Sequence, residues 1–212
     1  MQASAAALWI NAFFYGFDTT VTEFVHKLYD LSAPFFQGLF DFISFLGKDG
    51  IILILLSIVL TLFRKTRKVG IVMLLGLAIG ALFTNCCLKV LIARPRPYMD
   101  SESLFYKYWL VVGQRVESDK SFPSGHTTAA FAAMTGVFLT CNKKYSWTAF
   151  IFAFLMGIAR IYLCVHFPSD VLAGVIVGVV SSIIAYWISK KLPEKIYESD
   201  FLKKKKHGLH EK

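Results

Sequence analysis

The chain has 212 residues, of which 56% are hydrophobic and only 17% are charged, and its formal net charge is +9. A soluble globular domain carries about 25% charged residues, so the composition argues against that class and indicates an integral membrane protein. The basic residues lie between apolar segments and in the C-terminal tail, a distribution that favours a role in membrane orientation over nucleic-acid binding.

Residues 1–47 are rich in aromatic side chains but contain no long apolar run. Their two most apolar stretches, ALWINAFFYGFD and APFFQGLFDFISFL, are short and interrupted by polar residues. Such stretches are typical of helices that lie in the membrane interface, so we predict amphipathic or interfacial helices for residues 1–47. A full span within these residues is the alternative.

Five apolar segments follow, which we interpret as membrane-crossing helices, since a span needs about 20 mostly apolar residues; the first of them must start near Gly47 to be long enough. They cover approximately residues 48–63, 69–92, 125–141, 147–166 and 170–189. We therefore predict an all-α, polytopic membrane helix bundle, with one transmembrane domain at 48–190 and a basic tail at 191–212.

The distribution of lysine and arginine among the loops predicts how this bundle is oriented in the membrane. When the turns are assigned alternately to the two sides, the basic residues of 64–68, 142–144 and the tail fall on the same side. By the positive-inside rule that side is cytoplasmic, which places the loop 93–124 and the turn 166–170 on the outer face of the cell membrane. The tail is predicted to anchor this topology and to contact anionic lipid.

Polar and charged side chains collect at the outer ends of the apolar segments. A charge inside the bilayer costs about 3 kcal/mol on insertion scales, which makes such residues candidates for function. Snorkelling, helix capping or a stiff linker would explain any one of them, but not their common face. The set is Lys89, Arg94, Arg96, Ser124, Gly125, His126, Arg160, His166 and Asp170.

These residue types suit phosphate chemistry. Several cations beside a helix N-terminus form an anion site, and arginine contacts phosphate oxygens through two parallel hydrogen bonds. Of two histidines in such a site, one can attack phosphorus while the other protonates the leaving oxygen, and a carboxylate can orient the attacking imidazole. The four cysteines lack metal-binding spacing, and the sequence has no carboxylate cluster suited to a metal ion.

Three motifs occur in order on this face. KVLIARPRP fits Lys-x6-Arg-Pro, PSGH stands at 123–126, and ARIYLCVHFPSD fits Arg-x5-His-x3-Asp. With these motifs the chain resembles the type 2 phosphatidic acid phosphatase (PAP2) superfamily, whose members include membrane lipid phosphatases with a six-helix core. Ala159 departs from the pattern, since the family often has serine there, and the change removes one hydroxyl contact to phosphate.

The resemblance implies a role for each motif residue. His166 would be the nucleophile that forms a phosphohistidine, Asp170 would orient it, and His126 would protonate the leaving group. No metal or other cofactor is implied, and Arg94, which is outside the motifs, is predicted to be a cation at the rim. The residues implied to bind phosphate are Lys89, Arg96, Arg160, Ser124 and Gly125.

The expected substrate is a lipid phosphate at the outer membrane face, with undecaprenyl diphosphate the first candidate and phosphatidylglycerophosphate or phosphatidic acid the alternatives. The predicted partners are the bilayer and this lipid, without nucleic acid, and the sequence leaves the oligomeric state open. A vanadium haloperoxidase-like enzyme and a non-enzymatic lipid transporter are more remote alternatives. The loop 98–121 is predicted to edge the lipid groove through Tyr98, Tyr106, Tyr108 and Arg115.

Overall fold

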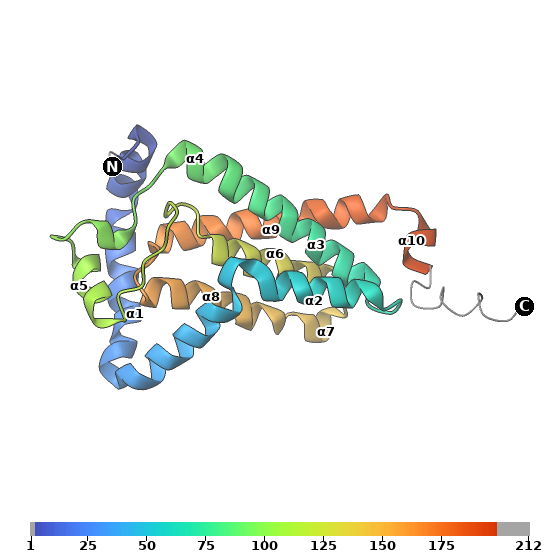
Figure 1. The fold of residues 1–212 in the computed structure, drawn as a ribbon, viewed down its shortest axis with the longest axis horizontal. Helices are drawn as coiled ribbons and strands as arrows, with labels where there is room; N and C mark the ends of the chain where they lie inside the picture. Colours follow the sequence, from blue (N-terminus) through green and yellow to red (C-terminus); the bar gives the residue numbers. More distant parts are fainter. Residues whose placement is uncertain (1–2, 199–212) are drawn as a thin grey trace, which may run out of the picture.

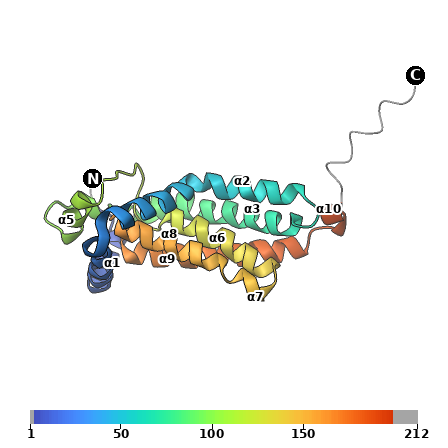
Figure 2. The same cartoon turned by 90° about the horizontal axis from the view of Figure 1, so that it is seen from below.

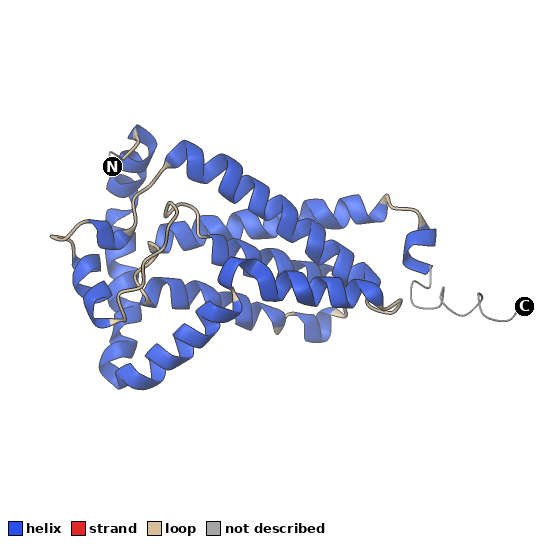
Figure 3. Cartoon of the chain, in the orientation of Figure 1, coloured by secondary structure: helices blue, strands red, loops and turns tan. Residues whose placement is uncertain are grey.

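The computed structural model describes residues 3–198, and the regular elements within them are all helices (Figure 3). The predicted all-α membrane bundle is confirmed, because four helical segments are long and apolar enough to cross a bilayer. These segments are Ala5–Leu62, Arg67–Met99, Lys143–Tyr162 and Pro168–Lys190. Most of the predicted topology anchor, residues 199–212, lies outside the described residues.

The elements follow one another with short connections, apart from the segments on either side of α5. In chain order they are α1 (Ala5–Leu46), the 3-10 turn η1 (Lys48–Gly50), α2 (Ile51–Leu62), α3 (Arg67–Ala81), the π-helix η2 (Leu82–Leu88), α4 (Lys89–Ile92), the 3-10 turn η3 (Pro97–Met99), α5 (Leu104–Val111), α6 (Gly125–Thr140), α7 (Lys143–Ser146), α8 (Ala149–Tyr162), α9 (Pro168–Lys190) and α10 (Glu194–Glu198).

The number of spans differs from the predicted five at α6. This helix has 16 residues, which is shorter than the ~20 that a span needs. It packs against α3, α8 and α9, and most of its side chains from Thr127 to Gly136 are buried among them. Its bounds differ by one residue from the predicted segment 125–141, so the sequence located the helix correctly, and a helix enclosed by other helices need not match the full thickness of the bilayer.

Helix α1 is a single 42-residue element with a sharp kink, where the sequence predicted separate short helices. The kink is at Ser32, whose backbone leaves the helical region, two residues before Pro34. Proline lacks the N–H of a helical hydrogen bond and clashes with the preceding turn, which accounts for the bend. The first part of α1 crosses one end of the bundle, and the second part runs back toward α2 (Figure 1).

Glycines of α9 bring its backbone against that of α6. A Cβ added to Gly178 would lie 2.6 Å from the carbonyl oxygen of Thr128, and one added to Gly174 would lie 2.8 Å from that of Ser124. Small residues allow this close approach of helices in a membrane bundle. The first turns of α6 and α9, which carry two of the three motifs, are therefore held side by side, and the N–H of Ser124 donates to the carbonyl of Asp170 (3.1 Å).

The two ends of the bundle differ in what they carry. Figures 1 and 2 show the N-terminal part of α1, α4, α5 and the first turns of α6 and α9 at one end, and α10 at the other. The basic turns at 63–66 and 141–143 and the C-terminal end of α9 also lie at the α10 end (Figure 1). The three motifs thus lie at one end of the molecule and the basic turns lie at the opposite end.

Candidate active site

Local backbone features bring the first motif back over the end of the bundle. The π-helix η2 precedes Lys89, and π-helical turns, which are rare, often occur at functional sites. Helix α4 then ends at Ala93, whose φ of 49° turns the chain sharply. The extended residues that follow place Arg94 and Arg96 against the turn between α8 and α9, where the third motif lies.

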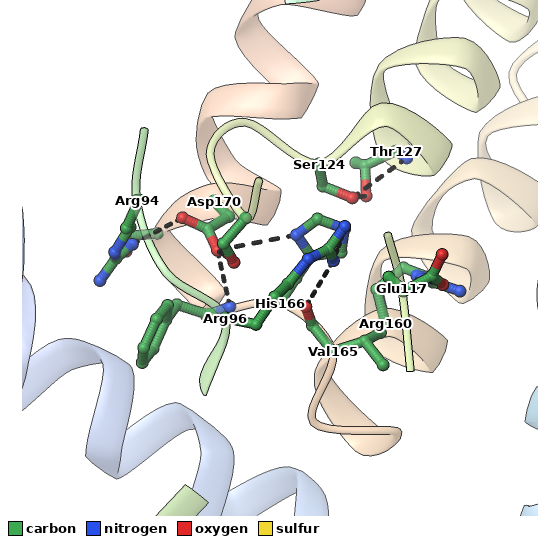
Figure 4. A network of polar contacts seen from close by, with 12 residues as sticks. Arg94, Arg96, Glu117, Ser124, Thr127, Arg160, Val165, His166 and Asp170 are labelled. Carbon is green, nitrogen blue, oxygen red and sulfur yellow. Dashed lines mark hydrogen bonds and ion pairs between the residues drawn. The ribbon is translucent and has the colours of Figure 1, made fainter. Parts of the chain in front are cut away.

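His166 is buried in that turn and is held from two sides. Nη1 of Arg96 lies 2.9 Å from Nε2 of His166 and also donates to the carbonyl of Val165 (2.6 Å). Because a guanidinium only donates, Nε2 must present its lone pair and the ring proton sits on Nδ1. Nδ1 lies 3.7 Å from Oδ2 of Asp170 (Figure 4). Burial, followed by the charges of Arg96, Arg160 and Lys89, holds the pKa of His166 well below its usual value.

Asp170 is fully buried and uses both carboxylate oxygens. Oδ2 accepts hydrogen bonds from the N–H of Phe167 (2.9 Å) and from the hydroxyl of Ser121 (2.5 Å). Oδ1 accepts from Nη1 of Arg94 (2.6 Å). The carboxylate therefore caps the first turn of α9 and at the same time faces Nδ1 of His166.

Arg94 does not lie at the rim, and the prediction of a rim cation is wrong. Its side chain is 1% exposed, stacks over the ring of Phe167 (3.9 Å) and lies between the carboxylates of Asp170 and Asp18. Asp18, from the N-terminal part of α1, also accepts from the N–H of Ser169 (2.7 Å). Sequence reasoning missed Asp18, although a carboxylate inside the aromatic stretch WINAFFYGFD was a usable signal.

The three cations predicted to bind phosphate are buried, and each contacts a carboxylate of the α5–α6 loop (residues 112–124). Lys89 and Arg96 both bind Asp119, through its two different oxygens. Arg160 binds Glu117 and donates to the hydroxyl of Ser44 (2.5 Å), whereas its Nε–H finds no acceptor among the described residues.

Asp119 keeps its negative charge at neutral pH. Burial raises the pKa of its carboxyl, but the hydrogen bond and charge of Lys89, together with those of Arg96, outweigh burial and leave the pKa below its usual value. Sequence reasoning missed both Asp119 and Glu117, because VESDK has the composition of an ordinary solvated loop.

A cavity of about 930 Å³ joins this polar cluster to the apolar interior. One part is lined by apolar residues of α2 and α3, such as Ile54, Leu74 and Leu77. The other part is lined by polar residues of the predicted site and by the two loop carboxylates: Lys89, Arg96, Gly125, His126, His166, Glu117 and Asp119. The cavity therefore offers one compartment for an anion and another for an apolar chain.

Not every predicted residue reaches this cavity. Arg160 and Asp170 do not belong to its lining. Arg160 contacts Glu117, which does line the cavity, and Asp170 lies beside His166, which also lines it. Ser124 is fully buried and caps α6, where its Oγ accepts from the N–H (3.4 Å) and the hydroxyl (2.9 Å) of Thr127. Its predicted role as a phosphate donor thus remains a prediction. Gly125 does line the cavity, and a Cβ added there would lie only 3.5 Å from Nζ of Lys89, so the backbone at Gly125 lies close to this cation.

The four residues predicted to edge the groove pack elsewhere. Tyr98 stacks on Trp109, next to Tyr106, and Tyr108 stacks on the buried ring of His26 in α1 at 3.9 Å between centroids. Arg115 pairs with Asp41, also in α1 (3.0 Å). Tyr108 and Arg115 thus fasten α5 and the loop after it onto α1, and none of the four residues belongs to the described lining of the cavity.

Comparison with known proteins gives consistent matches. The model of the PAP2 superfamily matches residues 50–194. An undecaprenyl-diphosphatase of Sulfolobus acidocaldarius is 30% identical over 76% of this chain and 75% of its own length. A bacitracin transport permease protein BcrC of Bacillus licheniformis is 43% identical, but over only 36% of this chain and 37% of its own length.

Among solved structures, the first transmembrane PAP2 type phosphatidylglycerolphosphate phosphatase from Bacillus subtilis superposes with a TM-score of 0.65. It is 27% identical to this chain, and the match covers 89% of this chain and 92% of that structure.

Proposed function

This chain belongs to the PAP2 superfamily, and from that premise we propose that it is a membrane lipid phosphatase or diphosphatase that works through a phosphohistidine on His166. The observation that carries the proposal is the position of one imidazole. Nε2 of His166 faces the guanidinium of Arg96 at 2.9 Å, while Nδ1 faces the carboxylate of Asp170 at 3.7 Å. This ring lines a cavity that is cationic at one end and apolar at the other.

The first chemical step transfers the phosphoryl group to the enzyme. Lys89, Arg96 and Arg160 bind the phosphate oxygens and stabilise the charge that they carry in the transition state. Nε2 of His166 attacks phosphorus as the bond to the leaving oxygen breaks, and that oxygen takes a proton from His126. The positive charge that develops on the His166 ring is stabilised by Asp170, next to the protonated Nδ1.

The second step restores the enzyme. A water molecule gives a proton to His126 and attacks the phosphorus of the phosphohistidine, the P–N bond breaks, and Nε2 recovers its lone pair. Inorganic phosphate then leaves the cations. Every group in this cycle is an ordinary side chain, so we expect turnover to persist in EDTA and to be inhibited by orthovanadate, which resembles the transferred phosphoryl group.

For the substrate we propose undecaprenyl diphosphate first. The cavity continues from the cationic cluster between the apolar side chains of α2 and α3, as a long prenyl chain requires. The relative from Sulfolobus acidocaldarius carries the name undecaprenyl-diphosphatase. Phosphatidylglycerophosphate is the second candidate, because the Bacillus subtilis structure of similar fold is a phosphatase for that lipid.

We further propose that the protein lies in the cell membrane with the site facing outward. The basic turns and α10 stand at the end of the bundle opposite the site (Figure 1), and the positive-inside rule places such an end in the cytoplasm. In this arrangement the segment 1–47 is an interfacial unit beside the site, 48–190 is the catalytic domain, and the tail lies in the cytoplasm.

A phosphate-release assay on the purified full chain tests this function. The panel should contain undecaprenyl diphosphate and monophosphate, phosphatidylglycerophosphate, phosphatidic acid and diacylglycerol diphosphate, with His166→Ala as the inactive control. We expect release from at least one lipid, the same rate in EDTA, and the highest kcat/KM for undecaprenyl diphosphate. Halide oxidation with added vanadate would favour the haloperoxidase-like enzyme instead. Lipid movement between leaflets without phosphate release would favour the lipid transporter.

A further inference from the structure

The cations assigned to the substrate are already occupied by the protein itself. The two oxygens of Asp119 bind Lys89 and Arg96, and an oxygen of Glu117 binds Arg160. Both carboxylates come from the α5–α6 loop, and both line the cavity in which the phosphate is to bind. The loop thus presents two anions at the positions that phosphate oxygens need.

The two sides of these ion pairs differ in how firmly they are held. The cationic side chains are 10% exposed or less, whereas the side chain of Asp119 is 46% exposed and that of Glu117 is 28% exposed. A half-exposed carboxylate regains water when it leaves its partner, but a buried guanidinium does not. Displacement therefore moves the carboxylates and leaves the cations in place.

The backbone of the loop is held at several points, so displacement concerns the two carboxylate side chains. It starts with Gly113 at φ 93° and Gln114 at φ 51°, a sharp change of chain direction after α5. Near its other end it is fixed by Ser121, whose N–H donates to the carbonyl of Arg94 (2.9 Å) and whose hydroxyl donates to Asp170. Between these two points the N–H of Glu117 donates to the hydroxyl of Tyr98 (3.0 Å), and the carbonyl of Asp119 accepts from Nε of Arg96 (3.0 Å), which leaves the two carboxylates as the parts that can leave the cations.

We propose that Asp119 and Glu117 are internal competitors for phosphate, which occupy the cations of the free enzyme and are displaced by the phosphate group of a bound lipid. The proposal rests on the function proposed above. A phosphate dianion can replace both carboxylates, since it brings the same charge and more acceptor oxygens to the three cations. When hydrolysis leaves inorganic phosphate, the carboxylates return and promote its release.

The competition weakens the binding of every phosphate ligand, so only a ligand with further contacts binds well. A lipid gains additional binding free energy because its apolar chain enters the compartment between α2 and α3. A soluble phosphate ester meets the same competition from the carboxylates without that gain. Asp119 and Glu117 therefore lower the affinity for soluble and lipid phosphates alike, and the apolar chain allows the lipid to occupy the site at concentrations at which soluble phosphate does not.

A purely structural role for these ion pairs predicts the opposite effect of mutation. If the carboxylates only hold the cations in position, then Asp119→Asn loosens the cations and weakens phosphate binding. If they compete, the same substitution strengthens phosphate binding. The sign of the change therefore distinguishes the two roles.

The experiment measures binding of inorganic phosphate to the full chain by calorimetry, for the wild type, Asp119→Asn, Glu117→Gln and the double variant. Loss of one charged competitor should tighten phosphate binding about tenfold, with a larger gain in the double variant. Asp119→Glu should bind like the wild type, and so should Glu102→Gln, which removes an exposed carboxylate from the neighbouring 100–103 turn. Thermal unfolding checks that each variant is folded.

Unchanged or weaker phosphate binding in folded Asp119→Asn and Glu117→Gln would overturn the competition. The parallel lipid assay separates this result from a failure of the proposed function. If the wild type hydrolyses lipid phosphate but the variants do not bind phosphate more tightly, the competition is rejected and the phosphatase function is kept. If the variants bind phosphate more tightly but the wild type hydrolyses no lipid, the phosphatase function is rejected and the competition between the carboxylates and an anion is kept.

Discussion

The two ends of the bundle both bury arginine, but they give it different partners. At the basic end, Arg67 is 1% exposed and donates to the backbone carbonyls of Thr61 (2.9 Å), Leu62 (3.2 Å) and Ile196 (3.3 Å). At the site end, Arg160 is equally buried and binds a carboxylate from a loop that lies partly in solvent. Burial of a cation in a membrane protein is thus a poor sign of function by itself. The informative property is whether its partner can be exchanged for a ligand.

The largest effect should come from removing Arg94, which joins the two carboxylates behind the nucleophile. Arg94→Ala leaves Asp18 and Asp170 buried without their cation, and breaking such a pair costs about 3–5 kcal/mol of stability. We also expect kcat to fall about 100-fold, since Asp170 no longer stays in place beside His166. Thermal unfolding and steady-state kinetics measure the two effects.

Arg94→Lys is the matched variant for a positioning role. It retains the charge but not the fork that reaches both carboxylates, so it should recover part of the stability and little of kcat. If Arg94→Ala unfolds more easily but keeps the kcat of the wild type, then Arg94 only stabilises the fold, and the two ends of the molecule no longer differ in the way described.

Removing Arg67 should have a smaller effect, confined to stability. Arg67→Ala leaves several partly buried carbonyls without this donor, which costs about 1–3 kcal/mol. Because these contacts lie at the end opposite the site, kcat/KM per folded molecule should stay within about twofold of the wild type. A large loss of kcat/KM in folded Arg67→Ala would break the comparison between the two ends.

The smallest expected effect is an absence of titration at His166. A free imidazole takes up a proton near pH 6.5, but burial and the cations Arg96, Arg160 and Lys89 lower the pKa of His166. A lowered pKa means that the ring stays neutral as the pH falls through 6.5 and is protonated only at much lower pH. Nitrogen NMR of histidine-labelled protein, with His166→Ala for assignment, should show neutral His166 at pH 6. A protonated ring at that pH would contradict the assigned Nε2 lone pair.

The three motifs were accessible from the sequence because each is a short local pattern at the end of an apolar segment. The structure brings Lys89, Arg96, Gly125, His126 and His166 to one cavity, as their common membrane face predicted. The α-helical class was equally accessible, since long apolar runs leave few other folds in a bilayer. The roles assigned to these residues stay predictions until they are tested.

Long-range pairings were not accessible in this way. Asp18 and Arg94 are 76 residues apart, and the kink of α1 at Ser32 decides that α1 crosses the bundle end where they meet. Asp119 stands in a loop whose composition is that of any solvated turn, so only the fold shows that its carboxylate reaches Lys89. The enclosure of α6 by α3, α8 and α9 was not accessible for a related reason, because apolarity does not distinguish burial in protein from exposure to lipid.

The central claim is that His166 carries the phosphoryl group. The most direct measurement is rapid acid-free quenching of the full chain with lipid diphosphate that is radiolabelled in its terminal phosphate, followed by mapping of the labelled peptide. We predict an acid-labile, base-stable phosphoenzyme on His166 that is absent in His166→Ala. Label on another residue, or an undiminished covalent species in His166→Ala, would contradict the account.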